Sequence, residues 1–539
     1  PISGDLTRNE NRLALPIMGR TQSWDNAWDV GAMSNYNTIT SLAESPVQEG
    51  LLYAGTDDGF IQVSENGGDS WRKIPVTALG LAPRTFVNDI KADLFDANTV
   101  YVALDNHKEG DFSPYLFKST DQGKTWKSIS GNIPDRTLVW RMVQDPVKKN
   151  LLFAATEFGI YTSLNGGKSW QKLDGAPTIS FRDLTIQKRE NDLVAASFGR
   201  GFYILDDYTP LRYLNPQDFE VKSKLYPIKE GLMFQESSPK GMKGKSSMGE
   251  SFFTSPNPPV GAVFTYIMND TLKTIKEIRQ TEEAKIKKLG GDVFYPSLEE
   301  IKAEDNEEKP FLLFLVRDSK GTEVRKLKTK VTTGINRLVW DFRHAPSVPL
   351  RLKPRVIGRY SGADEGPIAV PGKYSVEMYK SHNGIISKLT DPVSFEIKTL
   401  NNLSLPELNK EEALAFQQKI SDLQRAVRGA EKILSDIDIR VNYIKVAVES
   451  VPQLPLSLMP KAKKAENDII TLEIAFYGES SLSSREFEVK NSLSDRIETA
   501  IWSTLSHSST ASQTSIRLYE EAGQERFVLY FGRSHIQDF

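Results

Sequence analysis

The chain has 539 residues, a formal net charge of −2 and no cysteine. Since this length exceeds one compact domain, we expect about three domains. The near-neutral charge gives no bulk attraction to nucleic acid, and the lack of cysteine excludes a disulfide framework, a thiol nucleophile and a cysteine-ligated metal. No apolar run reaches the length of a transmembrane segment.

An eight-residue motif occurs three times in the first third of the chain, as SENGGDSW, STDQGKTW and SLNGGKSW. All copies fit S-x-[DN]-x-G-x-[ST]-W. In such a turn the Asp or Asn side chain accepts hydrogen bonds from backbone amides, Gly tolerates positive φ, and Trp covers the turn with apolar surface. We therefore predict a structural role for the residues of this box: Ser64, Asn66, Gly68, Trp71, Ser119, Asp121, Gly123, Trp126, Ser163, Asn165, Gly167 and Trp170.

Short runs of β-branched and aromatic residues precede each box. LLYAGTDDGFIQVS comes before the first and LLFAATEFGIYTS before the third, while LVAASFGRGFYILDD repeats the two strands without a box. Strand, turn, strand, box and strand at this period are typical of the four-stranded blades of a β-propeller. We expect residues 1–210 to form a partial propeller with four recognisable blades.

The first residues of the chain resemble the segment after the second box. Residues 2–8 read ISGDLTR and residues 129–136 read ISGNIPDR. The chain therefore begins like the last strand of a blade, and four blades make a small propeller, since four to eight is the ordinary range. We expect further blades, supplied either by an N-terminal portion that this sequence lacks or by another chain.

Residues 211–400 carry longer strand patterns, such as LFLVRDSKGTEVRKLKTKV, GINRLVWDFRH and VPGKYSVEMY. Their order predicts an immunoglobulin-like or fibronectin-like β-sandwich. A charged helical insertion at about residues 269–310 interrupts it, and its charge indicates a solvated face.

Residues 401–539 are predicted to form an α-helical bundle. Asn409 and Glu412 have the spacing of a helix N-terminal capping box. Apolar residues then alternate by three and four, which predicts a helical seam packed within the chain: Ile420, Leu423, Val427, Ala430, Leu434, Ile437, Val441, Ile444 and Val448. Further amphipathic helices are expected at residues 495–505 and 512–522.

No motif for a cofactor or a metal is recognisable. The chain has five scattered histidines and neither a phosphate-binding loop nor a nucleophile elbow. We expect no cofactor, no nucleic acid and no histidine-bound metal.

The turns between the second and third strands of propeller blades share one face with the loops that connect successive blades. Loops on a rigid scaffold tend to carry function, so we predict a ligand face formed by Asp57, Asp58, His107, Phe112, Glu157, Phe158, Phe198 and Arg200. The structural alternative is that these are tight turns with solvated acids.

A glycosidase needs paired carboxylates, and a sialidase also needs arginines for the substrate carboxylate. Arg141 and Arg182 fall on predicted inner strands and are candidates for the channel of the propeller. The structural alternative is an ion pair with Asp89 or Asp183.

Together, the three boxes, the blade motifs and the order of the later segments resemble the C-terminal portion of the bacterial sortilin-like family of BNR (Asp-box) repeat β-propellers. The resemblance implies an exported protein in the periplasm, at the outer membrane or on the surface of a Gram-negative bacterium. Sortilin-type propellers bind peptides and protein segments in a central tunnel, and the hydrolase name borne by some members is inherited from the box.

We therefore interpret the chain as a non-enzymatic binding or assembly protein, whose propeller presents a face to a peptide, protein or glycan. One alternative is a secreted BNR-repeat glycosidase or polysaccharide lyase. Another is a fixed subunit of an outer-membrane protein complex.

Overall fold

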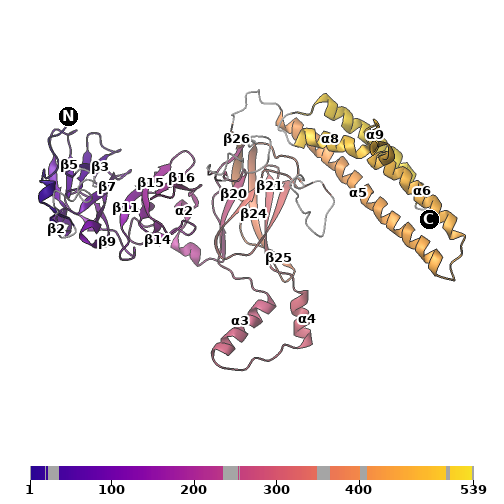
Figure 1. The fold of residues 1–539 in the computed structure, drawn as a ribbon, viewed down its shortest axis with the longest axis horizontal. Helices are drawn as coiled ribbons and strands as arrows, with labels where there is room; N and C mark the ends of the chain where they lie inside the picture. The colour runs from indigo at the N-terminus through magenta and orange to yellow at the C-terminus, as the bar shows by residue number, and fades with distance from the viewer. Residues whose placement is uncertain are drawn as a thin grey trace. The chain divides into compact units, whose positions relative to one another are not determined.

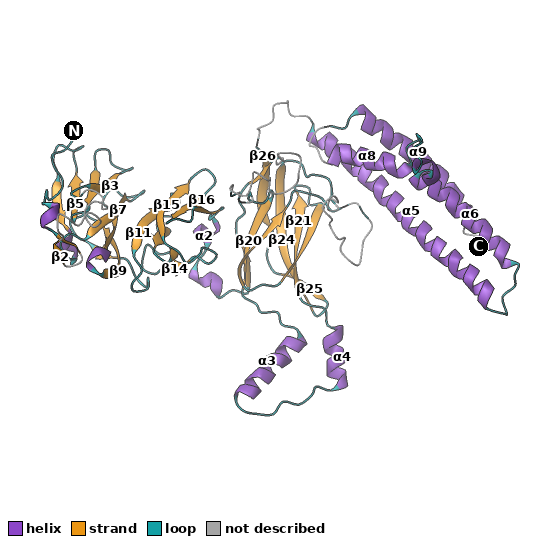
Figure 2. Ribbon diagram, in the orientation of Figure 1, coloured by secondary structure: helices purple, strands orange, loops and turns teal. Residues whose placement is uncertain are grey.

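The computed structural model describes residues 2–17, 20–21, 36–234, 253, 255, 257–346, 348, 365–400, 409–505 and 510–536. The chain divides into two compact units, Pro1–Glu220 and Val221–Phe539 (Figure 1). Strands make up the first unit and the beginning of the second, and long helices follow towards the C-terminus (Figure 2). The protein is thus mainly β, with a helical C-terminal region.

Four antiparallel meander sheets form the first unit, and each is one blade of a partial β-propeller. Blade 1 contains β3 (Ile39–Glu44), β4 (Leu52–Thr56), β5 (Phe60–Ser64) and β6 (Arg72–Pro75). Blade 2 contains β7 (Phe86–Ala92), β8 (Val100–Asn106), β9 (Asp111–Ser119) and β10 (Lys127–Ser128). Blade 3 contains β11 (Val139–Gln144), β12 (Leu152–Thr156), β13 (Gly159–Ser163) and β14 (Gln171–Lys172). Blade 4 contains β15 (Phe181–Gln187), β16 (Asp192–Ser197) and β17 (Phe202–Leu205).

Smaller elements lie around these blades. A two-stranded hairpin pairs β1 (Pro16–Ile17) with β2 (Arg20–Thr21), and the short helix α2 (Pro210–Tyr213) follows blade 4. The described residues of this unit also include four 3₁₀ turns: η1 (Arg12–Ala14), η2 (Val76–Leu79), η3 (His107–Glu109) and η4 (Pro216–Phe219).

The blades pack face to face through apolar side chains. Successive residues of a strand point to opposite sides of its sheet. In β8, Val102 and Leu104 therefore pack against blade 1, while Tyr101 and Ala103 pack against blade 3. Because both sides are covered, the central strands read as continuous apolar runs instead of alternating apolar and polar residues.

The three boxes hold the turns after β5, β9 and β13. In the second box, the Ser119 hydroxyl accepts a hydrogen bond from the Gly123 amide (2.8 Å) and donates one to Asp121 (2.7 Å). Asp121 accepts from the amide (2.8 Å) and the hydroxyl (2.6 Å) of Thr125, and Trp126 Nε1 donates to the Gly123 carbonyl (3.1 Å). In the other two boxes the serine likewise accepts the glycine amide, and Asn66 or Asn165 accepts an amide in place of Asp121. Each box is therefore a turn staple.

We expect Asp121→Ala to lower the free energy of unfolding by about 1 kcal/mol, as the loss of a turn-capping acceptor does. Hydrogen bonds from Thr125 lower the pKa of Asp121 to about 2, which is below its value in the unfolded chain. The contribution is therefore complete above pH of about 4 and is lost as the pH falls towards about 2.

Asp121→Asn is the matched control, because Asn66 and Asn165 already serve the other boxes. We expect it to retain most of the stability at pH 7 and to remove this pH dependence. Urea unfolding at pH 7 and pH 3 measures both effects. Equal losses for the Ala and Asn variants at pH 7 would contradict the proposed role of the side-chain oxygen as the acceptor of the turn.

A second repeated staple holds the turn between the first and second strands of blades 1 to 3. Ser45, Asp93 and Asp145 follow β3, β7 and β11, and each accepts hydrogen bonds from the amides two and three residues further on. Such side chains stabilise a turn by replacing backbone acceptors. This staple was not predicted from the sequence.

Two sheets of the second unit share one hydrophobic core. The smaller sheet contains β18 (Ser223–Leu225), β20 (Ala262–Met268) and β23 (Gly334–Trp340). The larger contains β19 (Gly231–Met233), β26 (Val393–Thr399), β24 (Gly372–His382), β21 (Phe311–Asp318) and β22 (Glu323–Lys330), with β25 (Ile385–Lys388) paired to β24. Phe264 of one sheet stacks on Phe314 of the other. An immunoglobulin-like relationship stays a prediction.

The charged insertion contains two helices, α3 (Ile275–Lys288) and α4 (Leu298–Asn306), neither of which has a buried residue. Arg279 of α3 forms ion pairs with Glu283 and with Glu304 of α4. The two helices are thus joined by charges and not by an apolar core.

The helical region contains α5 (Lys410–Ser450), α6 (Leu458–Tyr477), α7 (Ser480–Ser483), α8 (Leu493–Leu505) and α9 (Gln513–Ile536). The side chain of Asn409 accepts the Glu412 amide at the start of α5, which is one of the two hydrogen bonds of the predicted capping box. The predicted seam is buried at Ile420, Leu423, Val427, Leu434, Val441 and Val448. Ala430 and Ile444 are exposed, and α6 was not predicted. Within the described ranges, no helix is both long and apolar enough to span a membrane.

Candidate functional site

A β-bulge interrupts the first strand of every blade at the same position. The pairing of that strand with the second one skips a single residue, and the four skipped residues are Thr40, Asn88, Trp140 and Arg182. A bulge re-aims a side chain and is over-represented beside active sites. The repeat therefore marks one end of the blades as a candidate site.

All four bulge residues line one hollow of about 390 Å³, which we call the bulge hollow. The second and third strands turn at this end of the blades, whereas the boxes lie at the opposite end. The rest of the lining is Phe86, Asp105, His107, Lys108 and Arg141. The hollow thus joins residues from all four blades where their first strands converge.

Trp140 forms a fixed wall of the bulge hollow. The guanidinium of Arg182 lies over its ring at 3.6 Å, and the ring of His107 meets it edge-on with centroids 5.8 Å apart. The indole Nε1 donates to Glu157 Oε2 (3.0 Å), which also accepts from the Ser180 hydroxyl (2.9 Å). Because these partners bury Trp140, it shapes the hollow and leaves no free ring face.

One position on this face is acidic in three blades. In each blade, the residue before the bulge pairs with a residue of the second strand, and the position in question is the next residue along the chain. It holds Asp57, Asp105, Glu157 and Phe198 in blades 1 to 4. The predicted ligand face included three of these residues. Asp105 was not among the predicted residues.

Asp57 and Asp105 line a second, smaller hollow of about 90 Å³, the acid hollow, together with Arg84, Lys108 and Glu109. Both aspartates are buried. Asp57 accepts the amide (2.8 Å) and the hydroxyl (2.9 Å) of Thr38, and burial raises its pKa. Asp105 contacts Nδ1 of His107. Two carboxylates from adjacent blades thus meet one hollow beside two cations.

Tyr36 also lines the acid hollow. Burial, and then the charges of Asp58 and Glu10, raise the pKa of its phenol far above neutrality. Tyr36 is therefore a neutral hydrogen-bonding group at physiological pH and not an activated nucleophile.

The two predicted channel arginines have different roles. Arg141 donates to Asp89 Oδ1 (2.9 Å) and to the Asn88 carbonyl (3.1 Å), and its Nε lies 3.5 Å from Asp183. It therefore ties blade 3 to blade 2, as the ion-pair alternative described. Arg182 stacks on Trp140 and lies 5.2 Å from the ring of Phe198.

Six predicted face residues lie outside both hollows. Two of them, Glu157 and Phe198, contact Trp140 and Arg182 of the bulge hollow, as described above. Asp58 accepts the Arg8 amide and the Thr56 hydroxyl, so it anchors the N-terminal segment. The ring of Phe112 lies 5.5 Å from the guanidinium of Arg136. Phe158 and Arg200 lie in exposed hairpin turns. These residues surround the site without lining it.

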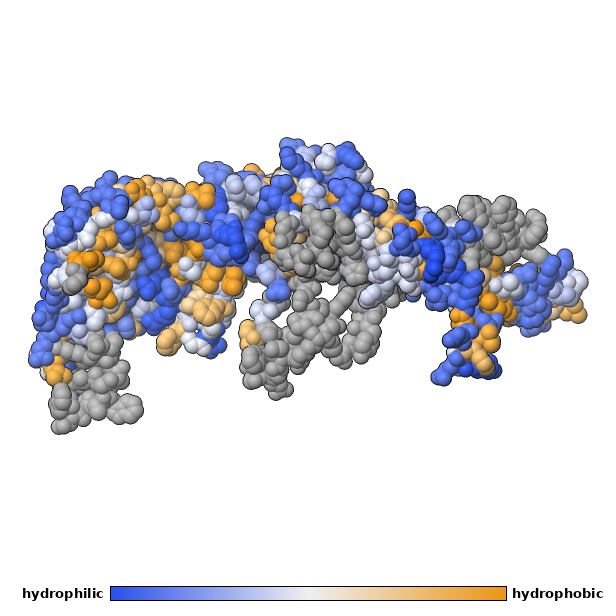
Figure 3. Space-filling view, turned by 90° about the horizontal axis from the view of Figure 1, so that it is seen from above, coloured by the Kyte–Doolittle hydropathy of each residue, from blue (hydrophilic) through white to orange (hydrophobic). Residues whose placement is uncertain are grey.

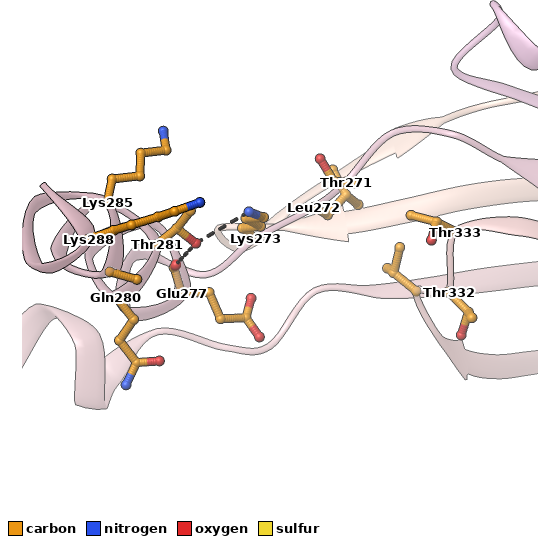
Figure 4. A pocket seen from close by; sticks show the side chains of 12 residues that line it. Thr271, Leu272, Lys273, Glu277, Gln280, Thr281, Lys285, Lys288, Thr332 and Thr333 are labelled. Atoms are coloured by element: carbon orange, nitrogen blue, oxygen red, sulfur yellow. Dashed lines mark hydrogen bonds between the residues drawn. The ribbon is translucent and has the colours of Figure 1, made fainter.

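A much larger hollow, of about 900 Å³, lies in the second unit between α3 and the turn before β23 (Figure 4). Lys273, Lys285 and Lys288 line it with threonines, and Lys273 donates to the Thr281 hydroxyl (3.4 Å). It has none of the repeated features of the propeller face. Among the described residues, no group of three or more potential metal ligands occurs.

No family model matches the chain. The xyloglucanase Xgh74A of Acetivibrio thermocellus is 26% identical over 168 residues, which are 29% of this chain and 19% of that protein. A xyloglucanase of Paenibacillus sp is 28% identical over 143 residues, which are 24% of this chain and 14% of that protein. The chain therefore spans about a fifth or less of the length of these curated relatives.

Among solved structures, the GH74 enzyme of Niastella koreensis is 17% identical and covers 32% of this chain and 29% of its own, with a TM-score of 0.27. The GH74 xyloglucanase of Xanthomonas campestris is 12% identical and covers 65% of this chain and 45% of its own, with a TM-score of 0.27. The propeller assignment rests on the four meander sheets themselves.

Proposed function

We propose that this protein is a glycosidase that acts on a polysaccharide, with its carboxylate pair in the acid hollow of the propeller. The observation that carries the proposal is that Asp57 and Asp105 occupy the same position in adjacent blades and line one hollow. Most glycosidases cleave between two carboxyl groups, one of which donates a proton while the other is a base or nucleophile. Similarity to xyloglucanases supports this chemistry and names xyloglucan as the first substrate to test.

The surroundings assign different roles to the two carboxyls. Burial raises the pKa of Asp57, which favours a protonated general acid. Asp105 beside His107 is the candidate base or nucleophile, and Arg84 and Lys108 offer hydrogen-bond donors to sugar hydroxyls. The exposed rings of Phe158 and Phe198 provide apolar surface for sugar rings.

A second candidate is the non-enzymatic binding protein. Thr38 donates hydrogen bonds to both carboxyl oxygens of Asp57, so Asp57 also has a structural role that requires no catalysis. In this case the same face holds a glycan, peptide or protein without cleaving it. For either candidate we propose an exported protein, in which the two-sheet region and the helices are docking or spacing modules.

One experiment separates these functions. The intact protein, isolated from its source cells, is incubated with xyloglucan, cellulose, xylan and mannan, and new reducing ends are measured alongside retardation in gels that contain each polysaccharide. Cleavage supports the glycosidase, and retardation without cleavage supports the binding protein. The absence of both on every polysaccharide would refute a glycan-directed function.

We expect Phe198→Ala to weaken retention on the bound polysaccharide about tenfold, the equivalent of one exposed aromatic contact. The ring is 72% exposed beside Arg182, and it lies at the position occupied by acids in the other blades. Phe294→Ala is a matched control, because Phe294 is 84% exposed but lies between α3 and α4. Equal retention of the two variants would exclude Phe198 from the binding face.

A further inference from the structure

The outermost blades leave two apolar faces open. We call the face of the blade 1 sheet that presents Ile39 and Leu42 the leading face. We call the face of the blade 4 sheet that presents Phe202 and Ile204 the trailing face. On the surface shown in Figure 3, hydrophobic residues gather on the left-hand part, which is the first unit. The blade repeat allows each open position to be compared with its covered equivalents.

On the trailing face, Phe202 pairs with Ala196 across the strands, as Ile160 pairs with Ala155 in blade 3. In blades 1 and 2, Ile61 and Leu116 hold the same position. Ile61 and Leu116 are 0% exposed and Ile160 is 5% exposed, whereas Phe202 is 78% exposed. Phe202 thus occupies a position that is buried between neighbouring blades elsewhere in the repeat but is exposed in blade 4.

The leading face shows the same contrast. Ile90, Met142 and Leu184 pack against the preceding blade and are at most 3% exposed. Their equivalent in blade 1 is Leu42, which is 66% exposed. Ile39 is 49% exposed, whereas its equivalents Val87, Val139 and Phe181 are fully buried.

The polar contacts across the junctions repeat as well. The Ser41 hydroxyl accepts the Ile90 amide of the next blade (2.9 Å), and Asp89 accepts the Met142 amide of the next blade (3.2 Å). Asp183 is the equivalent residue in blade 4, and its side chain is 66% exposed. The trailing face therefore offers both the apolar and the polar half of a blade junction.

The N-terminal segment shows how the chain reaches blade 1. Ile129 directly follows the last strand of blade 2, and it packs against Gly167, the glycine of the third box. Ile2 packs in the same way against Gly68 of the first box. Ile129 is 8% exposed because blade 2 covers it, whereas Ile2 is 64% exposed. Ile2 therefore lies where a residue leaving a preceding blade lies.

We propose that both open faces are junctions with further blades of the same meander repeat, in a polypeptide that runs directly into Ile2. One such blade covers Leu42 and Ile39, and the blade at the other end of that array covers Phe202 and Ile204, which closes the ring. The established junctions between blades 1 and 2, 2 and 3, and 3 and 4 supply the geometry. The proposal is independent of any catalytic activity.

Hydroxyl-radical footprinting with mass spectrometry tests this directly. In the intact protein from source cells, we expect Phe202 to be oxidised about fifteenfold more slowly than in the isolated chain 1–539, the ratio of 78% to 5% exposure. Leu42 should be protected in parallel. Equal oxidation of Phe202 in both samples overturns the proposal. Protection that grows with the concentration of the isolated chain also overturns it, because a second copy would then be the occupant.

A variant distinguishes ring closure from a local cover. Phe202→Asp, introduced into the intact protein, is expected to raise oxidation of Leu42 at the other open face, since one array of blades covers both. Ile385→Asp is the control, because Ile385 is 70% exposed and lies on β25 of the second unit. If Leu42 stays protected in the Phe202 variant, separate partners cover the two faces and ring closure is refuted.

Discussion

Asp105→Asn and Asp57→Asn are each expected to reduce polysaccharide cleavage about 10³-fold, the range in which general acid–base groups contribute. An amide preserves the shape of the side chain but can neither donate the acidic proton nor act as a carboxylate base. The two variants should still be retarded in polysaccharide gels, because Arg84 and Lys108 remain. Asp69→Asn is the control, since Asp69 is an exposed residue of the first box at the opposite end of the blade.

The pH profile separates the two roles. Because burial raises the pKa of Asp57, this group holds its proton to a higher pH than an ordinary aspartate, and cleavage should decline as the pH rises through that pKa. Asp57→Asn should remove this decline along with most of the activity. A variant that retains wild-type activity and the same alkaline limb would show that Asp57 is only the partner of Thr38.

The sequence predicts the blades well because each repeat carries its own local signals. Box residues such as Ser119 and Asp121 act within a single turn, so their spacing is enough to predict their contacts. The apolar runs of β4, β8, β12 and β16 are predictable for the same reason. Local chemistry therefore accounts for most of the first unit.

The bulges depend on pairing between strands, which a single strand does not reveal. Thr40, Asn88, Trp140 and Arg182 share no residue type, and only the skipped pairing makes them equivalent. This is why Arg182 was predicted as a channel residue while its three equivalents were not. Aligning the four first strands on their apolar residues Ile39, Val87, Val139 and Phe181 would have placed these four residues at one position.

Asp105 was missed for a different reason. In blades 1 and 3 a compact turn follows the acid, but in blade 2 the chain continues through η3 before β9. The excursion obscured the match of Asp105 to Asp57 and Glu157. Counting the same number of residues forward from the start of each second strand matches Asp105 to Asp57 and Glu157.

The helical seam failed at Ala430 and Ile444 because burial along α5 depends on which helices pack beside it. A repeat of three and four residues predicts a continuous stripe. Ile444 is 48% exposed, whereas Val441 and Val448 are buried on either side of it. Packing partners from distant sequence decide such positions, and the heptad pattern does not identify them.

The largest expected loss of stability follows from Asp145→Ala, at about 3–5 kcal/mol, the cost of removing one partner of a buried ion pair. The Asp145 side chain is fully buried, and its Oδ2 accepts the Tyr208 hydroxyl (2.7 Å) and Arg212 Nε (2.9 Å). Its other oxygen accepts the Val147 and Lys148 amides. The alanine variant would leave a mostly buried guanidinium without its carboxylate partner and three further donors without their acceptor, so the loss should exceed that of any box variant.

Ser45→Ala isolates the staple from the ion pair. Ser45 accepts the same two turn amides in blade 1 but has no cationic partner there, so we expect a loss of only about 1 kcal/mol. Burial alone would raise the pKa of Asp145, but hydrogen bonds from Arg212, the turn amides and Tyr208 outweigh it and hold the pKa below its usual value. The stabilisation is therefore complete above the unfolded-state pKa and is lost as the pH falls through the lower folded value. Urea unfolding, followed by pulse proteolysis of residues 1–220, measures the free energy of unfolding of both variants. A loss for Asp145→Ala no larger than that for Ser45→Ala would mean that the Arg212 contact adds no stability beyond the turn hydrogen bonds.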